Sequence, residues 1–168
     1  MTTTSRTGPV VKWLVTADPP GLLYGAIISA TALATASLHD SGASRVAITA
    51  GVVLVIYWMA DLYVHAISVR FDGDARGMLH RLGSAATHKA SVLKGGLPAI
   101  FVYVVVHGLG AETTTAAYVA LGFSVVLLTV VGYLGARQVD TPQRAAVLEG
   151  MGAGTLGIVI MVAKSLLH

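Results

Sequence analysis

The sequence contains no cysteine and no asparagine, and it is poor in charge. Without cysteine the chain cannot form a disulfide, a thiolate metal site or a cysteine nucleophile. Without asparagine it has no N-glycosylation site. Only 11% of its 168 residues are Asp, Glu, Lys or Arg, whereas about 25% is usual in soluble domains. Together with 55% hydrophobic residues, this composition predicts an integral membrane protein.

The sequence motifs of soluble enzymes are also missing. No HExxH, GxSxG or Walker sequence occurs, so we predict that the chain is not an enzyme and holds no cofactor. The net charge of +3 does not indicate nucleic-acid binding, because the basic residues fall in short loops between apolar segments. Apolar segments continue to the last residues, so a cleaved signal peptide is not expected either.

Five apolar segments each approach the ~20 residues that a helix needs to cross a ~30 Å hydrocarbon core. We therefore predict an all-α polytopic membrane protein, with a cytoplasmic tail at 1–17 and a single five-helix transmembrane domain at 18–168. A four-span alternative would leave a segment as apolar as 52–60 or 125–131 outside the membrane. The predicted spans are about 21–38, 44–68, 95–110, 114–135 and 141–167.

Lysine and arginine predict the orientation. Only Arg45 and Lys164 lie on one side, and Lys164 is close enough to the surface to snorkel. By the positive-inside rule, the N-terminus is inside and the C-terminus outside, in a multi-pass protein of the cell membrane. The inner residues are Arg6, Lys12, Arg70, Arg76, Arg81, Lys89, Lys94, Arg137 and Arg144.

The inner connection at about 70–94 is the longest and most charged. Apolar residues between Met78 and Ala86 share one helical face, and basic residues lie elsewhere, which predicts an amphipathic helix on the membrane surface between the second and third spans. Asp72 and Asp74 begin like a calcium loop, but Arg76 and Gly83 occupy positions that need an oxygen ligand.

The second span is apolar throughout, yet it contains Asp61. An acidic side chain at membrane depth costs roughly 2.5–3.5 kcal/mol on insertion scales and is usually retained for a function. Asp61 lies nine residues before Arg70, which is about 13 Å from the inner end of the helix at ~1.5 Å per residue. It must face a cavity, take a proton or pair with a cation, and Lys94 is the partner we expect first.

Two interpretations of Asp61 remain open. His65 lies one turn further along the same helical face, and Tyr57 lies one turn before it. In the first, Asp61 titrates in a proton- or cation-handling site, His65 shares the proton, and Tyr57 and Tyr63 supply hydrogen bonds. In the second, Asp61 is a buried polar clamp between the second and third spans.

Small residues recur every three or four positions in the first and last spans. Small side chains let transmembrane helices approach closely, so we assign both stripes to helix packing. Residues 152–157 also match the dinucleotide pattern GxGxxG, but a membrane segment offers neither the strand nor the helix start which that site needs. The packing residues are Gly21, Gly25, Ser29, Gly150, Gly154 and Gly157.

Three short sequences carry a family resemblance. They are Tyr24–Gly25–Ala26 at the start of the first span, the segment MADLYV at 59–64 and the glycine-rich segment at 150–167. With five spans and one long inner connection, they resemble the vacuolar iron transporter (VIT/CCC1-like) family. That family has an acid just after the start of its first helix and a glutamate-rich inner insert. Here residues 27–29 read Ile-Ile-Ser, and the connection at 70–94 has no glutamate.

The resemblance implies a homodimer that carries a cation. Asp61 is the acid of the second helix that carries over, with Met59 nearby as a soft ligand. Glu149, near the inner end of the fifth span, offers another carboxylate. A divalent metal ion held by Asp61, Met59 and Glu149 is therefore a candidate substrate rather than a cofactor.

We predict a VIT-like cation or proton-coupled transporter that uses an intramembrane carboxylate, with membrane lipid and a second copy of the chain as partners. The alternative is a non-transporting accessory or structural subunit of a larger membrane complex. The missing first-helix acid favours that alternative, and the basic surface helix would then bind anionic lipid or a partner. No nucleic-acid partner is expected.

Overall fold

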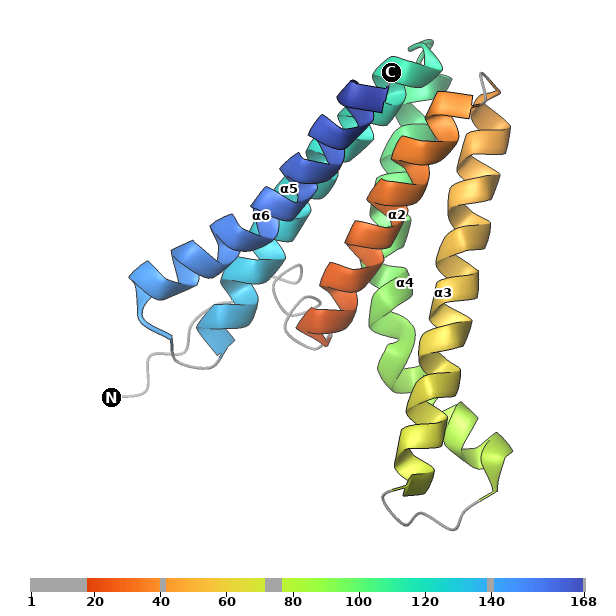
Figure 1. The fold of residues 1–168 in the computed structure, drawn as a ribbon, viewed down its shortest axis with the longest axis vertical. Helices are drawn as coiled ribbons and strands as arrows, with labels where there is room; N and C mark the ends of the chain where they lie inside the picture. The colour runs from red at the N-terminus through yellow and green to blue at the C-terminus, as the bar shows by residue number, and fades with distance from the viewer. Residues whose placement is uncertain (1–17, 40–41, 72–76, 139–140, 168) are drawn as a thin grey trace.

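The computed structural model describes residues 18–39, 42–71, 77–138 and 141–167, which form five α-helices (Figure 1). All five are long and apolar enough to cross a membrane. The predicted all-α architecture with five candidate spans is thus confirmed, while the tail at 1–17 lies outside the described residues. The helices are α2 (Pro19–His39), α3 (Ala43–Phe71), α4 (Met78–Gly108), α5 (Thr113–Gln138) and α6 (Gln143–Leu167).

Proline marks the starts of two helices. Pro19 opens α2 and Pro142 directly precedes α6, at positions where the missing N–H removes no intrahelical hydrogen bond. The first backbone bonds follow at once. The N–H of Leu22 donates to the Asp18 carbonyl over 3.1 Å, and the N–H of Ala146 donates to the Pro142 carbonyl over 3.0 Å.

The turn between α4 and α5 depends on a left-handed glycine. Gly110 has a φ of 96°, which a residue with a Cβ rarely adopts. Its N–H donates to the His107 carbonyl over 2.9 Å, and the N–H of Ala111 donates to the Val106 carbonyl over 3.3 Å. These bonds satisfy carbonyls at the end of α4, so α5 begins as early as Thr113.

Helix α4 differs from the sequence prediction. A separate surface helix at about 70–94 and a span beginning at Gly95 were expected, but one continuous helix runs from Met78 to Gly108. Its membrane-competent part begins at Lys89, and Figure 1 shows the earlier turns bending away from the rest. No proline occurs between 78 and 95, so nothing in the chain ends the helix before the span. Residues 72–76 lie outside the described part.

Helix α2 lies at the centre of the bundle. It packs against α4 and α3 on one side and against α5 and α6 on the other. Small alanines surround Leu33, Val46 and Tyr103 in the core where α2, α3, α4 and α5 meet. Figure 1 shows α5 and α6 side by side, diverging from α2 toward the end where α2 begins.

Glycines set the distance between α2 and α4. A Cβ added to Gly25 would overlap the backbone of Val92, and one added to Gly95 would overlap the backbone of Leu22. The first predicted packing stripe therefore lies in this contact, where the two backbones touch directly. Ser29, the third member of that stripe, is fully buried and donates its hydroxyl to the Ala26 carbonyl over 3.1 Å. Gly21 lies against the Ser91 side chain.

The second stripe lies between α5 and α6. A Cβ on Gly150 would lie 2.8 Å from the Thr129 carbonyl oxygen, and one on Gly157 would lie 2.9 Å from a Val125 methyl group. Gly154 would meet the Thr129 hydroxyl. Each of these glycines removes a clash rather than supplying a turn, so α5 and α6 form a closely packed pair.

The contact between α2 and α4 predicts the effect of Gly25→Leu. The larger side chain would press on the Val92 backbone, and overpacking of this kind costs about 1–3 kcal/mol or more. We expect a lower melting temperature in mild detergent, followed by intrinsic fluorescence. Gly152→Leu is the matched control, because a Cβ at Gly152 meets nothing within 4 Å. Equal melting temperatures for the two variants would contradict this packing.

The predicted orientation is tested by cysteine labelling, which the cysteine-free sequence allows without prior substitutions. Ser44 at the start of α3 and Gln143 at the start of α6 lie at opposite ends of the bundle and are exposed. In intact cells we expect a membrane-impermeant maleimide to label Ser44→Cys and to spare Gln143→Cys until the membrane is opened. Labelling in the reverse order would overturn the N-inside prediction.

Candidate functional site

Asp61 of α3 forms an ion pair with a lysine of α4. Lys89 Nζ lies 3.3 Å from Asp61 Oδ2, and the two side chains are 24% and 27% exposed. Asp61 is therefore neither free in bulk water nor isolated in an apolar interior. The pair joins the second half of α3 to the first half of α4, and these two helices also pack against each other. This is the arrangement expected of a polar clamp.

The partner of Asp61 differs from the one expected. Lys94 is exposed and does not contact Asp61 in the described part of the chain. Because α4 is already helical at Lys89, five residues separate the two lysines, which turns them about 140° apart around the helix. Only Lys89 faces α3. The error followed from starting the helix at Gly95, which left Lys89 in a separate segment.

The other members of the predicted set lie along α3 but do not converge on Asp61. His65 is half-buried and makes no hydrogen bond to Asp61 among the described residues. Tyr57 instead faces Tyr24 of α2, with ring centroids 6.4 Å apart and planes inclined by 30°. Tyr63 is exposed on the surface of α3. The structure thus brings Asp61 to Lys89, and Tyr57 to α2.

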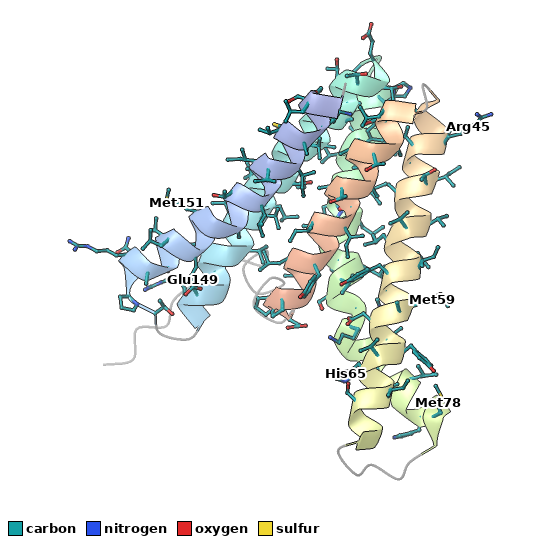
Figure 2. The ribbon with its side chains drawn as sticks, in the orientation of Figure 1. Arg45, Met59, His65, Met78, Glu149 and Met151 are labelled. Carbon is teal, nitrogen blue, oxygen red and sulfur yellow. The ribbon has the colours of Figure 1, made fainter. Side chains whose placement is uncertain are left out.

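The candidate metal ligands lie apart within one chain. Met59 is exposed on α3, and Figure 2 shows it on the opposite side of the molecule from Glu149 of α6. Helix α2 stands between, since α3 packs on α2 and α4 while α6 packs on α5 and α2. In the described part of the chain no group of three or more His, Asp or Glu side chains is placed to hold a metal ion.

A cleft of about 700 Å³ opens between α2, α5 and α6 at the end where α2 and α6 begin. Its described walls are mainly apolar, and among the described lining residues Glu149 alone carries an ionisable acidic or basic group apart from the Tyr24 phenol. Glu149 forms no ion pair within the described part of the chain. The main apolar wall residues are Leu23 and Ile27 of α2, Val131 of α5 and Leu156 of α6.

Small residues and prolines shape this cleft. Gly132, Gly135 and Ala136 leave the α5 wall shallow, and Pro19 and Pro20 form the rim at the start of α2. A Cβ on Gly135 would come within 3.3 Å of Pro19, so α5 and the start of α2 are in close contact at this point of the rim. Glu149 lies six residues after the start of α6, about 9 Å along the helix axis. Glu149 therefore lies about two turns from the helix terminus, and its side chain is exposed at the mouth of the cleft.

Lys164 is the residue that the sequence analysis placed wrongly. Snorkelling to the surface was expected, but its side chain is only 1% exposed. Its ammonium donates a hydrogen bond to the Ser37 hydroxyl of α2 and lies 5.1 Å from the centroid of the Tyr118 ring of α5. A cation over an aromatic face is stabilised by the ring quadrupole. The sequence held no signal for this site, because its three residues come from three separate helices.

Comparison of the chain with protein-family models, with curated proteins and with solved structures finds no match in any of the three. The described residues contain five candidate membrane spans, which indicates an integral, multi-pass membrane protein.

The Asp61–Lys89 pair predicts energetic coupling between two helices. We expect Asp61→Asn and Lys89→Met to lower the free energy of unfolding singly, and a double-mutant cycle to give a coupling of about 0.5–1 kcal/mol, as for partly exposed pairs. Denaturation in mixed micelles with increasing SDS measures it. Lys94→Met is the control, since Lys94 is exposed and does not face Asp61. Additive effects of the two substitutions would argue against the clamp.

Proposed function

We propose that this protein is a small membrane carrier for a cation, and that an intramembrane carboxylate carries or exchanges the charge. The observation that supports the proposal is the cleft between α2, α5 and α6, where Glu149 is the one carboxylate among the described lining residues. Ionisable residues inside membrane helices are costly, and they commonly face cavities that lie on transport paths. An apolar cleft of this size at one end of the bundle is such a cavity.

The electrostatics of the cleft favour a positively charged cargo. Glu149 has no cationic partner in the described part of the chain, whereas Asp61 has Lys89. A cargo cation or a proton would therefore neutralise Glu149 without first displacing another charge. For Asp61, the same step would require breaking the pair with Lys89. Of the two predicted carboxylates, Glu149 is thus the stronger candidate for exchange, with Asp61 as the second.

The resemblance to the VIT-like family also supports this proposal. It implies that the cargo is a cation and that the protein works as a homodimer, and the five-helix architecture is compatible with both. A second copy would also be one way to bring Glu149 of one chain toward Asp61 and Met59 of another. The position of the family's first-helix acid is occupied here by Ile27–Ile28–Ser29, and Ile27 lines the cleft.

A non-transporting structural subunit is the second candidate function. The observation that favours it is the Asp61–Lys89 pair. A carboxylate that is already paired with a lysine can hold two helices together without taking part in transport. The extension of α4 before Lys89 would then lie beside anionic lipid or a partner protein. Its basic residues make either contact favourable.

Flux through proteoliposomes tests the carrier proposal. We expect purified protein to move Mn²⁺ or protons, each followed by an enclosed fluorescent dye. Glu149→Gln should lower the rate about tenfold or more, because it removes the charge that offsets the desolvation of the cargo. Glu112→Gln is the matched control: it makes the same change at the other glutamate of the chain, which is exposed beyond the opposite end of the helices.

Asp61→Asn is measured alongside these variants. Reduced flux in Asp61→Asn together with normal flux in Glu149→Gln would show that the exchanging carboxylate is Asp61 of α3 rather than Glu149. Absence of flux for both ions, combined with purification in a stable larger assembly, would favour the structural subunit.

A further inference from the structure

The cleft between α2, α5 and α6 has the size of a small-molecule site rather than of an ion site. Its volume of about 700 Å³ falls within the roughly 300–1,000 Å³ typical of pockets for organic ligands. Such pockets are mainly apolar and have a few polar groups that orient the ligand. Here Leu23, Ile27 and Leu156 provide apolar surface, and Glu149 provides the polar group.

Within one chain, the described polar lining of the cleft supplies too few ligands to hold a bare metal ion without a second copy. Calcium and magnesium take six or more oxygen ligands, and softer metals add imidazole or sulfur. Among the described residues, the cleft offers one carboxylate, and its lining contains no histidine or methionine. Tyr24 is the only other described lining residue whose side chain carries an oxygen. A single negative charge on an apolar wall instead matches a cation with one charge and its own apolar surface.

We propose that this cleft binds amphipathic organic monocations, with the cationic centre at Glu149 and the apolar body against Leu23, Ile27 and Leu156. The idea that these cations are the cargo rests on the proposed carrier function. The prediction that they bind depends only on the shape and charge of the cleft.

Charge complementarity gives the site its selectivity. Glu149 is exposed at the mouth of the cleft and has no partner among the described residues, so a cation that enters meets an unneutralised carboxylate beside an apolar wall. Tyr24 also lines the cleft, but its ring lies beside that of Tyr57 on α3, so the charge of Glu149 provides the selectivity. An anion of equal size would meet repulsion, and a neutral molecule would leave the carboxylate desolvated and uncompensated.

The position of the cleft allows such a ligand to enter. It opens at the end where α2 and α6 begin, on the side where α5 and α6 diverge from α2 (Figure 1). Figure 2 shows Glu149 on α6 in this same part of the molecule. A partly apolar cation can therefore reach the carboxylate from the membrane boundary without crossing the packed core around Tyr103.

Tetraphenylphosphonium and tetraphenylborate test the inference, because these ions share size and shape and differ in the sign of the charge. Binding to the full-length protein in dodecylmaltoside is measured by equilibrium dialysis, with empty micelles subtracted. We expect tetraphenylphosphonium to bind about tenfold or more tightly than tetraphenylborate, which corresponds to about 1.4 kcal/mol. Glu149→Gln should remove most of this difference, and Glu112→Gln should leave it unchanged.

A second variant guards against misfolding. Glu149→Asp keeps the charge and should keep the preference for the cation, while size-exclusion profiles report the fold of all variants. Equal binding of the two ions, or a preference that survives Glu149→Gln, would overturn the inference and indicate a cleft that takes neutral lipid chains. Flux separates this result from the carrier proposal. Glu149-dependent Mn²⁺ or proton flux without organic-cation binding would reject the ligand class alone, and binding without any flux would reject the carrier alone.

Discussion

The direct contact between α2 and α4 is the constraint on which the rest of the bundle depends. Lipid tails are as apolar as the side chains, so helices in a membrane associate by van der Waals packing rather than by hydrophobic burial. Where Gly25 meets Val92 and Gly95 meets Leu22, backbone lies on backbone. This contact fixes one side of α2. The opposite side is then shared between packing against α5 and α6 and lining the cleft.

Two lysines show how positive charge is accommodated between these helices. Lys89 lies against Asp61 and keeps part of its surface in contact with the surroundings. Lys164 is buried at the other end of the bundle, where a hydroxyl of α2 and an aromatic ring of α5 take the place of a carboxylate. Both lysines therefore hold helices together, and Glu149 is left as the charged side chain that lines a cavity without a partner among the described residues.

The sequence predicted what depends on local chemistry and missed what depends on how helices lie against each other. Apolar length predicted all five candidate spans. The partner of Asp61 was wrong because it depends on where α4 begins, and glycines at both Gly77 and Gly95 left two possible starts, of which the structure has the first. The burial of Lys164 and the cleft around Glu149 could not be predicted, because each is assembled from three helices that are distant in sequence.

The close packing of α5 on α6 has a mechanical consequence. Gly150, Gly154 and Gly157 join the two helices into one rigid unit. That unit is attached to α2 at two levels. Far from the cleft, Ala34 packs against Leu121 and Met161, and Lys164 binds Ser37; beside the cleft, Leu22 packs against Val131. A tilt of the helix pair that widened the mouth would have to separate Leu22 from Val131, so the packing of its own wall keeps the mouth beside Glu149 at a constant width.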